Sequence, residues 1–208
     1  MTHRSRITIA PTAQALPLDA LKAHLRVTHD AEDELILAAL AAAVSYGEHL
    51  TNRQWLQATR VLTLDAWPSR LAWTAYVELP FPPLQRVESV VYVDAAGETQ
   101  TMVEGVDYVV DNSSGTMPAR LYRGEAWPQT VIRPGAVSIT YVCGFPQTES
   151  PEVAVLPPGI VAWLKIRVAD LYAQRESLAM ESRSQSFVEL PRSYVDGLLD
   201  PWIVPGGM

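Results

Sequence analysis

The chain has 208 residues, of which 48% are hydrophobic, and a formal net charge of -7 at pH 7. This length and composition are typical of a globular fold with one large domain, or a domain with a sizeable insertion. The acidic balance argues against a broad basic surface for gripping nucleic-acid phosphates, so sequence-specific DNA binding is not expected. The single cysteine, Cys143, excludes an intrachain disulfide framework and a thiolate metal cluster, which fits a reducing compartment.

Residues 1–17 form the first distinct stretch. They lack the apolar core of a signal peptide, and the longest apolar run in the chain, LILAALAAAV, is far shorter than the roughly 20 residues that span a bilayer. We therefore expect synthesis in the cytoplasm and no membrane contact. A short β-prone piece, Ile7 to Ala10, stands before two prolines, and we interpret residues 1–17 as an N-terminal arm that becomes ordered against something else.

Two helices are predicted next, a short one over Leu18 to Val27 and a central one within residues 28–56. Asp30 is expected to cap the central helix, and further acids favour the positive end of its dipole. Its apolar residues recur at spacings of three and four and predict a core-facing stripe: Ile36, Leu40, Ala43, Gly47 and Leu50. Because the alanines and Gly47 are small, a partner helix could approach this helix closely.

The period changes to two in residues 57–150, which predicts a β-rich insertion. The strands are expected at Arg60–Trp67, Val87–Val93, Thr101–Val103, Tyr108–Asp111 and Ala136–Val142. Gly97 lies in the turn DAAGET between the second and third of these strands, where a hairpin needs a positive φ angle.

Helical periodicity returns after Pro157-Pro158-Gly159 and predicts a third helix that ends near Arg175. Residues 177–208 are interpreted as a docking tail. Met180 to Ser193 is polar and expected to be flexible or ordered by a partner, and apolar residues follow it that have no reason to remain in water: Leu198, Leu199, Trp202 and Ile203. The predicted class is α+β. It comprises a small α-helical bundle (18–56 and 157–176), a β-rich insertion between the second and third helices, and an extended C-terminal tail.

No constellation of catalytic residues is found in the sequence. His24 and His29 lie among acids but are five residues apart across a predicted helix break, so capping acids and solvated histidines explain them better than a metal site. The chain contains no HExxH, GxSxG, GxxxxGK[ST] or GxGxxG pattern, and Cys143 is best explained as a small buried residue. We therefore predict no catalytic, cofactor-binding or metal-binding residues, and a protein that is not an enzyme.

The ordered features resemble the head-tail connector (adaptor) proteins of tailed bacteriophages and gene transfer agents over roughly residues 16–176. The resemblance rests on the order of LDALKAHLRV, DAEDELILAALAAAVSYGEHLTNRQWLQATRVLTLDAWP, ELPFPPLQRVESVVYVDAAGETQTM, DYVV, the Trp127-Pro128 pair, AVSITYVCGF and PPGIVAWLKIRVADLYAQRE. The N-terminal arm and the tail after Glu176 carry no matching motif.

This resemblance implies a structural virion protein that forms a ring, usually of twelve copies, beneath the portal. Such a ring extends the channel for double-stranded DNA, without sequence-specific binding, and presents a platform for a stopper or tail-terminator protein. Its location would be the head-tail interface of the virion, after assembly in the host cytoplasm. An acidic or neutral channel wall would let DNA slide during ejection.

Two groups of residues are candidates for these contacts. The tail residues Leu198, Leu199, Trp202 and Ile203 are expected to dock on the portal or a neighbouring subunit, and Ala38, Ala42 and Ser45 are expected to pack between copies in the ring. Alternatives remain from other classes: a neck stopper or tail-completion protein, and a small accessory enzyme such as a hydrolase, which would need a converging nucleophile and base.

Overall fold

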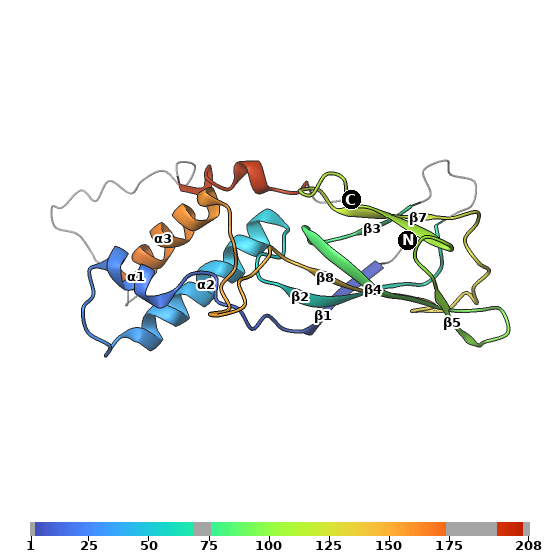
Figure 1. Cartoon of the computed structure of the whole chain (residues 1–208), viewed down its shortest axis with the longest axis horizontal. Helices are drawn as coiled ribbons and strands as arrows, with labels where there is room; N and C mark the ends of the chain where they lie inside the picture. Colours follow the sequence, from blue (N-terminus) through green and yellow to red (C-terminus); the bar gives the residue numbers. More distant parts are fainter. Residues whose placement is uncertain (1–2, 69–75, 174–194, 206–208) are drawn as a thin grey trace, which may run out of the picture.

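The computed structural model describes residues 3–68, 76–173 and 195–205. The molecule is elongated, with the helices at one end and the strands at the other (Figure 1). In chain order the elements are β1 (His3–Ile9), α1 (Leu18–Leu25), α2 (Asp33–Thr51), β2 (Ala58–Leu64), β3 (Tyr76–Leu79), β4 (Leu84–Val93), β5 (Thr99–Met102), β6 (Tyr108–Asp111), β7 (Ala119–Arg123), β8 (Val137–Cys143), α3 (Pro158–Ala173) and the 3-10 turn η1 (Asp200–Trp202). The described residues therefore confirm a mixed α+β fold, with three α-helices and two antiparallel sheets.

The start of α2 differs from the sequence prediction. Its N-terminal flanking residue is Glu32, and no side chain caps the first turn. Asp30 instead accepts a hydrogen bond from the Lys22 ammonium at 2.5 Å, and Asp33 accepts another from the same group at 2.8 Å. The prediction that Asp30 caps the helix was wrong because the spacing along one helix cannot show that a lysine from α1 competes for the carboxylate.

The helix ends of α1 and α2 follow a common pattern. Arg26 and Asn52 both adopt the left-handed conformation, with φ angles of 59° and 51°. Each residue donates its backbone N–H to carbonyls of the last helical turn, which satisfies acceptors that have no partner in the helix. The chain turns sharply after α2 as a result, toward the strands.

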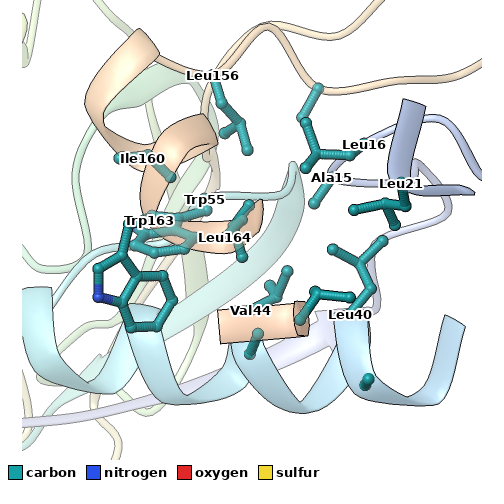
Figure 2. Packing of buried hydrophobic residues seen from close by; sticks show 14 of the residues in the cluster. Ala15, Leu16, Leu21, Leu40, Val44, Trp55, Leu156, Ile160, Trp163 and Leu164 are labelled. Atoms are coloured by element: carbon teal, nitrogen blue, oxygen red, sulfur yellow. The ribbon is translucent and has the colours of Figure 1, made fainter. Parts of the chain in front are cut away.

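The helical end has its own apolar core. Leu40 and Val44 of α2 face Ile160, Trp163 and Leu164 of α3 (Figure 2). Trp55, which follows α2, lies edge-on to Trp163 with ring centroids 5.7 Å apart. A Cβ atom on Gly47 would lie 2.0 Å from the Trp55 ring, so this glycine makes room for an indole of its own chain. The small residue predicted to admit a partner helix therefore serves internal packing.

The strand end is built from two sheets, ordered β1-β2-β8-β4-β5 and β3-β7-β6. The strands β2, β4, β5, β6 and β8 overlap the predicted ones, whereas β3 and β7 were not predicted. Residues 3–9, expected as part of an arm, form β1, which pairs antiparallel with β2 at the edge of the larger sheet. The N-terminal residues are therefore ordered by the chain itself.

A second apolar core lies between the two sheets. It contains Leu62, Ile139 and Tyr141 from the larger sheet and Val77 and Leu121 from the smaller one. Outside these strands, the Trp67 and Trp127 rings stack in parallel with centroids 4.4 Å apart. The two cores share no residue, which divides the apolar stabilisation of the molecule between its ends.

Candidate assembly surfaces

The side chains that most often act in catalysis or bind metals lie apart from one another in the described residues. His24, His29 and His49 are exposed, and among the described residues no three His, Cys, Asp or Glu side chains gather as metal ligands would. Cys143 is fully buried, and burial raises the pKa of its thiol to about 12. A thiol with this pKa stays protonated at neutral pH and is not an active nucleophile.

A buried polar cluster joins the two ends of the molecule, and Glu48 of α2 is at its start. One Glu48 carboxylate oxygen accepts hydrogen bonds from the backbone N–H of Trp55 at 2.7 Å and of Leu56 at 3.2 Å, and from the Gln54 amide at 2.9 Å. These bonds fix the turn that carries the chain from α2 into β2. Burial raises the pKa of Glu48, and the hydrogen bonds from the amides only partly oppose this effect.

Arg60 of β2 continues this cluster across the sheet. Its guanidinium donates to Gln54 Oε1 at 2.6 Å and to Ser5 Oγ of β1 at 3.2 Å, and it lies 3.7 Å from the centroid of the Phe81 ring. Tyr141 donates its hydroxyl to the Pro80 carbonyl at 3.0 Å. We call Glu48, Gln54, Arg60, Ser5 and Tyr141 the polar joint. Its directional hydrogen bonds fix the orientation of the helices relative to the sheets.

The C-terminal segment 195–205 returns to the helical end. Asp196 accepts hydrogen bonds from Trp163 Nε1 at 3.0 Å and from Arg167 Nη2 at 3.1 Å. At the other end of the segment, the Val204 amide donates to the Thr51 carbonyl at 2.9 Å, and Asn52 donates to the Val204 carbonyl at 3.1 Å. Between these anchors, Arg53 donates from Nε to the Trp202 carbonyl. The segment is thus fastened along α3 and the end of α2.

This placement changes how the predicted docking residues are understood. Leu199 is 1% exposed and lies in the helical core, Leu198 packs on that core, and Trp202 packs edge-on against Phe145. Three of the four residues are thus covered by the chain itself, which hydrophobicity alone cannot distinguish from burial against a partner. Ile203 is the exception, since it is 45% exposed. Residues 177–194 and 206–208 of the predicted tail lie outside the described residues.

The predicted ring-packing residues share one exposed helix face. We call this the α2 outer face, and its residues are exposed along the whole helix: Glu34, Leu35, Ala38, Ala41, Ala42, Ser45, Tyr46 and His49. The opposite side of α2 is buried in the helical core. The structure places Ala38, Ala42 and Ser45 together, in the middle of a surface that no described element covers.

A second uncovered surface was missed in the sequence. Residues paired across antiparallel strands point to the same face of a sheet, so the register defines three rows on the side of the larger sheet away from its core. The rows are Arg4-Thr63-Ser138-Val91-Thr101, Arg6-Val61-Thr140-Ser89 and Ile9-Thr59-Val142-Arg86. Thr59 and Val142 of the third row are buried, so the uncovered part of this face is formed mainly by the first two rows. We call this the open sheet face. Its signal was present in the polar positions of the alternating strands, but only the register assembles them into one surface.

The charges on the open sheet face have one sign. None of its residues is acidic, and the nearby Glu88, at the bulge in β4, pairs with Arg86 at 3.0 Å. Arg4 and Arg6 are exposed and form no ion pair with the described residues. A basic, hydroxyl-rich surface on a chain with a net charge of -7 is suited to contact with an acidic partner.

None of the described helices is both long and apolar enough to cross a bilayer.

Comparisons with known proteins give a whole-chain match in structure. No protein-family model matches the sequence, and no curated protein does. A chain in the solved structure "Neck of empty GTA particle computed with C6 symmetry" has a TM-score of 0.71 at 23% identity, covering 99% of this chain and 97% of that chain. A chain in "Virion of native gene transfer agent (GTA) particle" gives 0.71 at 22%, covering 98% and 97%, respectively. One in "Neck of native GTA particle computed with C12 symmetry" gives 0.65 at 22%, covering 99% and 97%.

These matches define the fold. It is one also found in a chain of the gene transfer agent particle, and it extends over both the helical and the strand end of this molecule.

Proposed function

We propose that this protein is a non-catalytic structural component of a phage-like virion, located at the head-tail interface. The observation that carries the proposal is the match of the entire chain, with TM-score 0.71, to a chain from a particle neck. Function is not fixed by fold alone. Here the sequence resemblance to head-tail connectors points independently to the same part of a virion.

Within the virion we assign the chain the role of the adaptor, which forms a ring under the portal. Two of the solved necks were computed with sixfold and twelvefold symmetry, which supports a ring of identical copies, and we propose twelve. The ring would continue the DNA channel from the portal and carry a stopper or tail-terminator protein. The net charge of -7 is compatible with a channel wall that holds DNA weakly.

Contact with the portal is assigned to the C-terminal segment around Ile203. This side chain is 45% exposed, whereas Leu198, Leu199 and Trp202 stabilise the fold of the chain itself. Ile203→Asp should reduce attachment of the purified protein to portal-bearing capsids without lowering its melting temperature. Ile132→Asp is a matched control, because Ile132 is also exposed and lies between β7 and β8 at the strand end. Normal occupancy of the Ile203→Asp protein on capsids would contradict the assignment.

The decisive experiment for the function is removal of the protein during particle assembly. We expect filled heads that carry portals but lack tails, and restoration of tailed particles when the protein is added back. Cryo-electron microscopy of complete particles should then show the ring directly against the portal. A ring that contacts the tail tube and not the portal would identify a stopper or tail-completion protein instead.

A further inference from the structure

The two uncovered surfaces of the chain both present small side chains. The α2 outer face presents small side chains in its centre, Ala38, Ala41, Ala42 and Ser45, so another element can approach the helix closely. The open sheet face presents short side chains too, with threonine, serine and valine at most of its positions. A helix lying on a sheet is one of the basic layered arrangements of protein structure.

Their dimensions also agree. The 19 residues of α2 extend over ~28 Å at 1.5 Å per residue. The larger sheet has five strands, which at roughly 4.8 Å between neighbours gives a width of ~20 Å. One α2 helix therefore reaches across the sheet from β1 to β5.

The charges of the two surfaces are opposite. Arg4 and Arg6 give the open sheet face its unpaired positive charge, at the β1 edge. Glu34 is the acid of the α2 outer face; it is exposed and forms no ion pair with the described residues. Electrostatic complementarity of this kind selects the orientation of a contact more than it adds affinity.

We propose that the open sheet face of one copy receives the α2 outer face of the next copy. The occupant is a second copy of this chain, because the chain itself carries both halves of a contact that the isolated molecule leaves unused. Since the two halves are different surfaces, the contact is heterologous and repeats from copy to copy, so it closes into a ring when the rotation permits. The inference rests on the proposed ring and specifies which surfaces form it.

Cross-linking within assembled particles tests the contact. The variant Ala42→Cys/Thr140→Cys places one thiol on each surface, while the native Cys143 is buried and remains unreactive. Treatment of particles that contain the double variant with a short bifunctional maleimide should produce a ladder of cross-linked species up to the size of the ring. Each single variant should remain monomeric, because a heterologous contact brings the two different thiols together and keeps identical ones apart.

A matched control uses Ala42→Cys/Ser114→Cys, in which the second thiol is also exposed but lies in the loop between β6 and β7. This control should give no ladder. Dimers from Ala42→Cys alone, or equal ladders from the two double variants, would overturn the proposed contact. If cryo-electron microscopy shows the ring but Ala42→Cys/Thr140→Cys gives no ladder, the inference fails and the function stands. If no ring is present, the proposed function fails.

The charge contribution has a separate test. Arg4→Glu/Arg6→Glu should lower the number of copies retained per particle, because the new carboxylates then repel Glu34 on the α2 outer face. Arg133→Glu is the control, since Arg133 is exposed but outside the three rows. Unchanged occupancy of the Arg4→Glu/Arg6→Glu protein would contradict the electrostatic part of the inference.

Discussion

The helical end and the strand end of this molecule are each stabilised by an apolar core, whereas the contact between the two ends is polar. Each end has an apolar core in which tryptophan rings pack closely, Trp55 with Trp163 at one end and Trp67 with Trp127 at the other. The region between them depends on hydrogen bonds of Glu48 and Arg60. Apolar burial thus supplies stability within each end, whereas directional polar contacts determine how the ends are oriented.

The largest expected effect comes from removing a core indole. Trp163→Ala should destabilise the protein by about 3–5 kcal/mol, because a fully buried ring is replaced by a cavity. If the two cores are separate, hydrogen exchange should become faster in α2 and α3 while β8 retains its protection. Trp127→Ala, in the other core, should show the reverse pattern. Equal loss of protection at both ends in each variant would show that the cores unfold as one unit.

The next effect concerns the polar joint. Arg60→Leu should lower the free energy of unfolding by about 1.5–3 kcal/mol, since the charged donor of two hydrogen bonds is lost and the buried Gln54 keeps an unsatisfied oxygen. The two ends should then melt in separate transitions, which calorimetry would resolve. Arg86→Leu is the control. Arg86 is exposed on the open sheet face, so the substitution should change stability by less than about 0.5 kcal/mol. A single transition of unchanged midpoint for Arg60→Leu would argue against the joint.

A smaller effect is expected at Gly47. An added methyl group would overlap the buried Trp55 ring, and overpacking costs about 1–3 kcal/mol. Alanine is also the better helix former by ~1 kcal/mol, so the net loss from Gly47→Ala should be about 0–2 kcal/mol. Urea denaturation measures it, with Ser45→Ala on the α2 outer face as the control. A stabilised Gly47→Ala protein would mean that the indole moves aside without loss of packing.

The smallest effect is a dependence on pH. Burial raises the pKa of Glu48 above its usual 4.5, so the folded protein holds this proton more tightly than the unfolded chain does. Its contribution to stability is therefore complete at low pH and declines as the pH rises from 4.5 through the raised pKa. Glu48→Gln removes this titration. The stability of the original protein relative to Glu48→Gln should fall with increasing pH, and parallel curves would disprove the assignment.

Much of the fold follows from patterns local in sequence. The three helices and five of the strands were predictable because apolar periodicity extends over enough residues in each. The strands β3 and β7 were missed because the charged side chains of Glu78, Arg120 and Arg123 interrupt their apolar pattern. Length alone does not explain it, since β5 and β6 also have only four residues. Short strands with charged side chains differ little from loops in sequence, and the pairing that forms them is not local.

The candidate surfaces were harder to predict for a similar reason. Ala38, Ala42 and Ser45 share an exposed face because helical geometry relates them directly. The open sheet face depends on a register between β1, β2, β8 and β4, which no single segment contains. The burial of Leu199 within its own chain could not be predicted, because a buried leucine has the same sequence pattern whichever molecule covers it.

The chain passes between the helical end and the strand end three times, after β1, after α2 and after β8. A force that pulls the two ends apart is therefore shared by three covalent connections in parallel, and the strands β2 and β8 that emerge from two of them are direct neighbours in one sheet. Pulling would load their hydrogen bonds together and resist extension more strongly than a single linker. Such mechanical stiffness along the long axis would suit the proposed position between the head and the tail of a particle.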